Sequence, residues 1–270
     1  MKKSWNWIFV ATCIFAISCK KNTSPAPEDS TLAPLSIEFD NIVGGQNLVM
    51  GNEVKYENSS DEKFSISLIQ YFISNISVKN TDGKEYVIPQ DSSYFLIKES
   101  EPLTCIANVQ APEGDYSEIS FILGVDSLRS TMDISLRTGV LDPAREVENG
   151  MYWGWNSGYV FYKMEGLADV APLDPGSEHK FRYHIGGFGG YNAPTINNIR
   201  KITLDLNAGG IARVRSGRGS NVHVMVDLAK MFSGSSTISI ADNSTVMFSP
   251  FSANVADNLP GMFRHDHTEN

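Results

Sequence analysis

The sequence predicts an all-β fold, an antiparallel β-sandwich of many short strands with one or two short helical turns. Short segments rich in β-branched and aromatic residues recur along the chain, with turn-forming residues between them. Apolar and polar residues alternate over Ile119–Leu123 and Val222–Val226, so one face of each strand is expected to be buried. Asp82-Gly83, between two such segments, is a strong hairpin signal. Many short strands with closely spaced turns are typical of sandwiches and barrels.

The expected strands follow one another without a second linker or an internal repeat, which indicates a single domain over residues 35–270. Helical pattern is scarce, with one turn expected near Asp126–Met132 and another at Asp227–Phe232. In chain order, the expected strands are Leu35–Phe39, Phe64–Val78, Glu85–Ile88, Tyr94–Ile97, Leu103–Val109, Tyr116–Val125, Gly158–Met164, Lys180–Ile185, Ile199–Leu206, Ile211–Val214, Asn221–Val226, Thr237–Ile240 and Thr245–Phe248.

The N-terminus has the pattern of a secretory signal. Two lysines precede the apolar run Trp7–Ile17, which is too short to span a bilayer and ends at Ser18-Cys19. A cysteine at this point predicts a lipoprotein signal over residues 1–18, with Cys19 carrying the lipid; the alternative is an ordinary signal peptide cut nearby. We therefore expect a lipid-anchored protein of the cell envelope, in the outer membrane and facing the periplasm or the surface.

A flexible tether over residues 19–34 is expected to follow, because proline, serine, threonine and charge dominate there. Cys105 is the one cysteine that remains beyond the anchor, so the mature chain cannot form an internal disulfide or a cysteine-based metal site. We expect Cys105 to be a small buried apolar residue. A net charge of −9 without a basic stripe argues against nucleic acid as a partner.

The segment 150–166 contains the densest aromatic patch. Trp153 and Trp155 would lie on one face if this segment is extended, with glycines that let a backbone or a ligand approach closely. The alternative is an ordinary aromatic stack in the core.

The histidines are the candidate metal ligands. His184 precedes a glycine-rich segment, and His223 lies on the strand face opposite the valines around it. His265 and His267 flank one residue, so an extended backbone would place both rings on the same face. Imidazoles suit copper or zinc, and copper fits an envelope site without thiolates. The alternative for the terminal pair is a frayed tail.

Enzyme signatures are missing from the sequence. It has no nucleophile elbow, no zinc-protease motif, no phosphate loop and no dinucleotide fingerprint. We therefore expect a protein that is not an enzyme.

Several segments, taken in order, resemble the MbnP-like family of copper-binding proteins. They are Leu68–Ile76 with Asp82-Gly83, Gly114–Tyr116, Gly124–Ser127, Leu141–Pro143, Met151–Tyr159 with Glu165-Gly166, and His184–Gly186. The resemblance implies a periplasmic or surface-attached β-sandwich. It also implies copper held by histidines together with kynurenine, an oxidised tryptophan, which a di-haem, peroxidase-like partner makes.

Carried over to this chain, the resemblance makes His184 the first candidate ligand and Trp153 or Trp155 the candidate for oxidation. His223, His265 and His267 are further candidate ligands. The chain departs from the family in lacking the cysteines of its copper-sequestering members and in carrying residues 144–149 where relatives run shorter.

The sequence thus favours a membrane-anchored copper-binding protein in metal acquisition or handling. Two rivals stay open. In a structural or glycan-binding sandwich, Trp153, Trp155 and Tyr159 would form an exposed platform for sugar. A hydrolase would instead need a cleft with convergent carboxylates.

Overall fold

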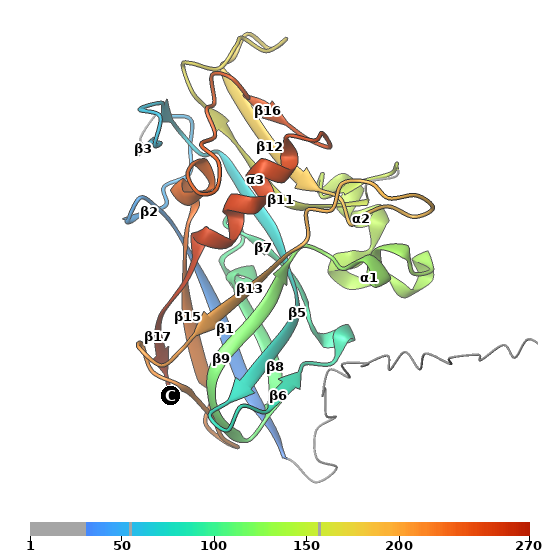
Figure 1. Ribbon diagram of the computed structural model, residues 1–270, viewed down its shortest axis with the longest axis vertical. Helices are drawn as coiled ribbons and strands as arrows, with labels where there is room; N and C mark the ends of the chain where they lie inside the picture. Colours follow the sequence, from blue (N-terminus) through green and yellow to red (C-terminus); the bar gives the residue numbers. More distant parts are fainter. Residues whose placement is uncertain (1–30, 54–55, 156–157) are drawn as a thin grey trace, which may run out of the picture.

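Two β-sheets face each other across a shared core, as the alternation of apolar residues predicts. The computed structural model describes residues 31–53, 56–155 and 158–270 (Figure 1). Inward-facing side chains of both sheets, among them Phe39, Phe121 and Val224, form one buried cluster. The predicted all-β, sandwich-like fold is confirmed. The signal segment, Cys19 and the tether up to residue 30 lie outside the described residues.

The smaller sheet is built around β1, the first strand. β1 pairs with β15 in parallel, from Leu35 opposite Ser220 to Ile42 opposite Asp227. Parallel strands need a long connection between them. Here β1, at the start of the described domain, pairs with β15, near its end. The strands of this sheet are β1 (Leu32–Val43), β2 (Gln46–Asn47), β8 (Ile106–Pro112), β15 (Ser220–Asp227) and β17 (Phe263–Glu269).

The larger sheet has β5 as its long central strand, which pairs with β6, β7, β9 and β11. Its strands are β5 (Leu68–Asn80), β6 (Glu85–Val87), β7 (Tyr94–Lys98), β9 (Gly114–Leu123), β10 (Tyr152–Trp153), β11 (Gly158–Leu167), β12 (Lys180–Gly186), β13 (Arg200–Asp205), β14 (Ala212–Val214) and β16 (Thr245–Val246). The hairpin predicted at Asp82-Gly83 joins β5 to β6, and Gly83 supplies the positive φ of 84° that its turn requires.

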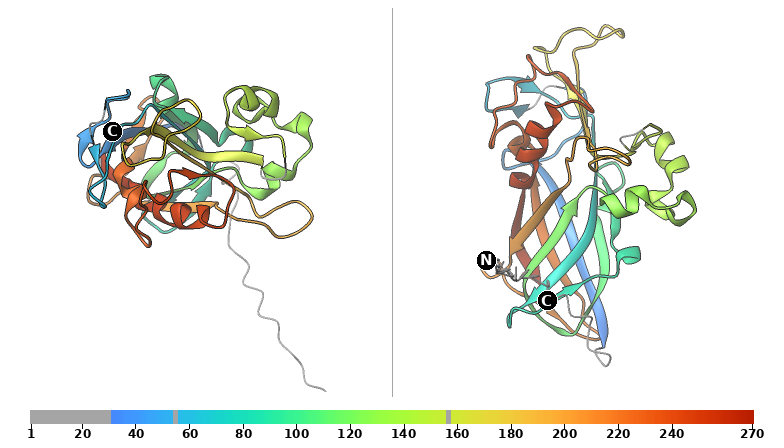
Figure 2. Two further views of the ribbon diagram at one scale, coloured as in Figure 1. Left: turned by 90° about the horizontal axis from the view of Figure 1, so that it is seen from above. Right: turned by 45° about the vertical axis from the view of Figure 1, so that its right-hand side comes forward.

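Short helices and a small hairpin complete the fold, and Figure 2 shows α1 and α2 projecting from one side of the sheets. They are β3 (Tyr56–Glu57), β4 (Lys63–Phe64), α1 (Ser127–Thr131), α2 (Pro143–Glu148), α3 (Ser252–Asn258), and the 3-10 turns η1 (Gln90–Ser92), η2 (Pro102–Cys105), η3 (Ile134–Leu136), η4 (Gly139–Leu141), η5 (Leu228–Phe232) and η6 (Leu259–Met262). Among the described residues, no helix has the length and apolar character needed to cross a membrane.

Several details differ from the prediction. The β1–β15 and β12–β16 pairs are parallel, whereas an antiparallel sandwich was expected. β1 starts at Leu32, inside the expected tether, because β8 pairs with it there. Thr237–Ile240 is not a strand, since the Ile240 amide binds the Glu62 side chain rather than a neighbouring strand. The terminal segment, for which a frayed tail was the alternative, forms strand β17 and pairs with β15.

A second, smaller core lies on the outer face of the larger sheet. Phe72 of β5 points into this cluster, while its neighbours Tyr71 and Ile73 point into the main core. Val125, before α1, and Leu141, in η4, cover it, and Trp153 packs against its border. The outer face of the larger sheet is therefore partly closed by the helical side of the molecule, and it is here that the aromatic patch lies.

Candidate functional site

The two tryptophans of the aromatic patch stack on each other at the surface. Their ring centroids lie 5.4 Å apart with the planes inclined by 28°. Phe248 meets the Trp155 ring edge-on at 5.3 Å. Trp155 is 55% exposed, so the patch is not an ordinary core stack. Tyr159 does not belong to it, because it is fully buried and its hydroxyl donates to the Leu141 carbonyl.

Trp153 lies directly on the backbone of Gly186. A Cβ atom added to Gly186 would come within 2.9 Å of Trp153 Cζ3, and closer still to the Tyr159 carbonyl oxygen. Residues two apart on a strand project from the same face. His184 therefore leaves β12 on the face that Trp153 covers.

His184 is held by a carboxylate from the neighbouring strand. Its Nε2 atom lies 2.7 Å from Glu165 Oε1, and Lys163 Nζ lies 3.7 Å from the same oxygen. All three side chains are mostly buried. The hydrogen bond from His184 outweighs burial and lowers the pKa of the Glu165 carboxyl, so this group is a carboxylate at neutral pH.

His223 and His267 meet on the outer face of the smaller sheet. They are direct partners in the β15–β17 ladder, and their ring centroids lie 4.9 Å apart. The Asp266 carboxylate accepts from His267 Nδ1 at 2.9 Å, which raises the pKa of His267. Asp266 therefore joins the two imidazoles. The sequence did not predict this role, although the position of Asp266 between two histidines was a signal for it.

His265 does not share a face with His267, contrary to expectation. The register of β17 shifts at this point, because His267 pairs with His223 while His265 pairs with the adjacent Val224. The extra residue of this β-bulge is Asp266, and it turns the His265 ring to the other face. There the Nε2 atom lies 2.9 Å from Thr268 Oγ1, and burial lowers the pKa of His265.

His184 and His223 cannot bind one ion together. Next to His184, Tyr183 and Ile185 point into the main core, and next to His223, Val222 and Val224 point into the same core. The two histidines therefore project from the outer faces of opposite sheets. Two of the candidate ligands, His184 and His223, therefore belong to separate faces of the described structure.

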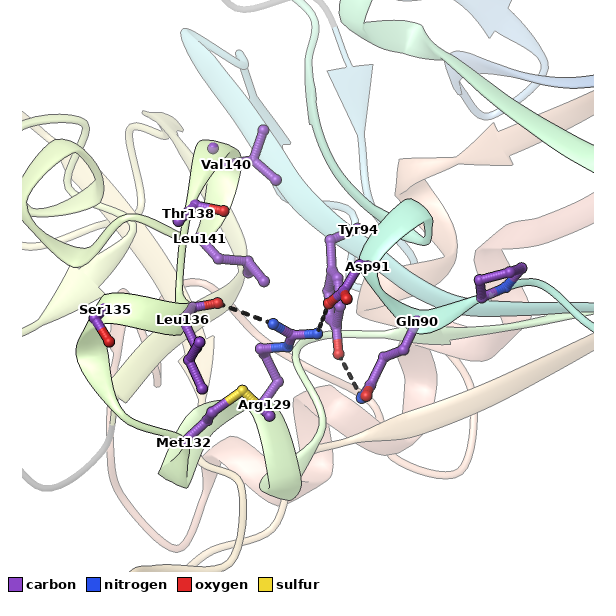
Figure 3. A pocket seen from close by; sticks show the side chains of 12 residues that line it. Gln90, Asp91, Tyr94, Arg129, Met132, Ser135, Leu136, Thr138, Val140 and Leu141 are labelled. Atoms are coloured by element: carbon purple, nitrogen blue, oxygen red, sulfur yellow. Dashed lines mark hydrogen bonds and ion pairs between the residues drawn. The ribbon is translucent and has the colours of Figure 1, made fainter.

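A pocket of about 800 Å³ lies between η1 and the turns η3 and η4 (Figure 3). Asp91 is the one acidic residue among the described residues that line it, and it forms an ion pair with Arg129. Arg129 also donates to the Leu136 carbonyl at 3.0 Å and lies over the Tyr94 ring. With its only carboxylate bound to arginine, this pocket does not have the convergent carboxylates that a hydrolase of the kind considered above needs.

Comparison with known proteins gives one family and one related structure. The sequence matches the family model MbnP over residues 32–248. The fold is similar to that of MbnP from Methylosinus trichosporium, with a TM-score of 0.55, 16% sequence identity and coverage of 82% of each chain. At this identity the likeness shows the shared fold alone. No curated protein matches the sequence.

Proposed function

Because this chain belongs to the MbnP family, we propose that it is a membrane-anchored, non-catalytic protein that binds copper. Its role would be metal acquisition or handling at the cell envelope. The family supports the copper-related role, and the predicted signal over residues 1–18, directly before Cys19, supports the anchor. Copper is the cargo of such a protein rather than a cofactor of a reaction.

The observation that carries the copper proposal is the contact between Trp153 and Gly186 on the face from which His184 projects. A tryptophan ring, an imidazole and the Glu165 carboxylate are thereby grouped on the outer face of β11 and β12. Trp153 is the better candidate for oxidation, because it contacts Gly186 on the face from which His184 projects, whereas Trp155 stacks on Trp153 and is exposed.

These residues fit copper when Trp153 is oxidised. Without oxidation the face offers one imidazole and one carboxylate, which are too few donors for tight binding of Cu(I). Kynurenine would add an aromatic amine, and a di-haem, peroxidase-like partner would supply the oxidation. Glu165 would orient the His184 ring, and Lys163 would balance the charge of Glu165.

Copper titration of protein from the native host tests this proposal. We expect His184→Gln and Trp153→Phe each to weaken binding at this face more than tenfold, about 1.4 kcal/mol. His265→Gln and Trp155→Phe are the matched controls and should bind as the wild type does. Equal affinity in all four variants would contradict the proposed site.

A glycan-binding role is the second candidate, and the 55% exposure of Trp155 favours it. Its platform would consist of Trp155 and Phe248, without Tyr159. In that case Trp155→Phe would weaken binding to an immobilised glycan panel, whereas His184→Gln would have no effect.

A further inference from the structure

We propose that His223, Asp266 and His267 form a second metal site, for a divalent late transition-metal ion such as Cu²⁺ or Zn²⁺. This site lies on the outer face of the smaller sheet, away from Trp153 and His184. It is independent of the function proposed above, because it needs no oxidised tryptophan. Asp266 and His267 also lie beyond residues 32–248, which match the family model.

The β-bulge of β17 builds the site. His223 and His267 are opposite each other in the ladder, so their side chains leave the sheet side by side. The extra residue at the bulge places the Asp266 carboxylate beside both rings. One ligand atom from each of the three residues lies within 4.8 Å of the others.

The nitrogen and oxygen distances are close to those of a tetrahedral site. His223 Nδ1 lies 3.6 Å from Asp266 Oδ2, and His267 Nδ1 lies 2.9 Å from the same oxygen. With metal bonds of about 2.0–2.1 Å, tetrahedral ligand atoms lie roughly 3.3 Å apart. Small side-chain movements therefore suffice to close the three donors around an ion.

His223 Nδ1 is a buried nitrogen without a hydrogen-bond partner in the described structure. Such a group carries a desolvation cost that a ligand would remove. Its free position faces Asp266, where the ion would lie. A metal ion bound there would satisfy this nitrogen directly.

The surroundings favour metal at both Nδ1 atoms. Asp40 Oδ2 lies 3.8 Å from His223 Nε2, and Glu269 Oε1 lies 3.7 Å from His267 Nε2. Carboxylates that accept a hydrogen bond from the second ring nitrogen orient metal-binding histidines and make them stronger ligands. Both carboxylates here lie less than about 1 Å beyond hydrogen-bond distance, so a small side-chain movement would let them take this role. Two imidazoles with one carboxylate suit a borderline divalent ion rather than a hard ion such as Ca²⁺ or a soft one such as Cu(I).

Among the described residues, Arg264 is the one arginine or lysine that forms an ion pair with Asp266. Its Nη1 atom lies 3.0 Å from Asp266 Oδ1 and leaves Oδ2 to the imidazoles. An arginine beside a cation site repels the ion. Removing the charge of Arg264 should therefore strengthen metal binding, so this variant is expected to gain affinity rather than lose it.

The test uses the full chain, produced in a host that lacks the peroxidase-like partner, so that its tryptophans stay unmodified. Titration with Cu²⁺ and with Zn²⁺ should give one equivalent bound, and Ca²⁺ should not compete. His223→Ala, His267→Ala and Asp266→Asn should each weaken binding more than tenfold, and Arg264→Gln should strengthen it several-fold. His265→Ala is the matched control, one residue away but on the other face.

Circular dichroism of each variant separates loss of the site from loss of the fold. Wild-type protein that binds neither ion, or equal affinity in His265→Ala and His267→Ala, would overturn the site. Loss of the bound equivalent in His184→Gln but not in His223→Ala would also overturn it, while leaving the proposed copper function standing.

Discussion

At the scale of single residues, Gly186 and Glu62 are two positions at which segments distant in the sequence meet. Gly186 lets Trp153 and the Tyr159 carbonyl approach the backbone of β12. Glu62 ties residues 239–241 to the chain that precedes β4, since its carboxylate accepts from Ser239 and from two backbone amides. Each makes a separate prediction.

Gly186→Ala should displace Trp153. The added Cβ would lie 2.9 Å from Trp153 Cζ3 and closer still to the Tyr159 carbonyl oxygen. Both contacts are closer than such atoms are found, so the Trp153 ring and the β11 backbone must move. We expect a loss of about 1–3 kcal/mol in the free energy of unfolding, as for overpacked sites, and a change in tryptophan fluorescence. Gly154→Ala is the control, because a Cβ there meets open space. Identical fluorescence of the two variants and the wild type would contradict the contact.

Because of Glu62, the free energy of unfolding should fall as the pH becomes acidic. Burial raises the pKa of this carboxyl, but hydrogen bonds from Ala241, Asn58, Ile240 and Ser239 outweigh it and lower the pKa. A carboxyl with a lowered pKa in the folded state stabilises the fold above its unfolded pKa of about 4.3, and this contribution is lost as pH falls through the folded value.

Glu62→Gln should therefore cost about 2 kcal/mol at neutral pH, as expected for hydrogen bonds to a charged group, and should flatten the loss of stability below pH 4.3. Urea unfolding over a pH series measures both effects. The exposed Glu57→Gln is the control. The same acid dependence in both variants would show that Glu62 is not the group responsible.

At the scale of elements, the sequence predicted strands better than it predicted their partners. Alternation located β9 and β15 correctly, since this pattern depends on neighbouring residues alone. The parallel β1–β15 pair and the bulge at Asp266 depend on contacts between distant segments, so no local pattern contained them. The positions of His265 and His267 could not be predicted for this reason. α2 was missed although Asp142 caps it and Pro143 begins it, a signal that was present.

The contribution of β17 to the core needs a direct test, because its charged sequence is typical of a frayed C-terminal tail. Phe263 at its start is buried and packs edge-on against Phe39, Tyr71 and Phe121. Phe263→Ala should lower the free energy of unfolding by roughly 3–5 kcal/mol, as for other buried phenylalanines. Glu269→Ala, at the exposed end of the strand, should have little effect. A loss below about 1 kcal/mol for Phe263→Ala would mean that β17 is not part of the core.

At the scale of the whole molecule, one core shared by two sheets carries a separate candidate site on each outer face. Sequence reasoning identified the aromatic patch and every histidine of these sites. It could not assign them to faces, since this depends on which strands oppose each other across the core. Pairing of His184 with Glu165 follows from the β11–β12 register and was likewise invisible in the linear sequence.

The predicted lipid anchor at Cys19 would attach the protein to a membrane of the cell envelope. Cys19→Ala should leave an uncleaved precursor or release the protein into the soluble periplasmic fraction, because the lipid attachment is lost. Detergent partitioning of the wild type and of the variant measures this. Cys105→Ala, which removes the thiol of the folded domain, is the control and should partition with the detergent phase like the wild type. Equal partitioning of wild type and Cys19→Ala would refute the anchor.

The most direct test of the copper-binding function is the copper content of the protein purified from its native host, with the mass of the peptide that contains Trp153. We expect copper in near-stoichiometric amount and a mass for Trp153 that corresponds to kynurenine. Copper should persist in the His223→Ala, His267→Ala double variant and fall in His184→Gln. Unmodified Trp153, together with only trace copper in protein from copper-supplied cells, would contradict copper binding at this face.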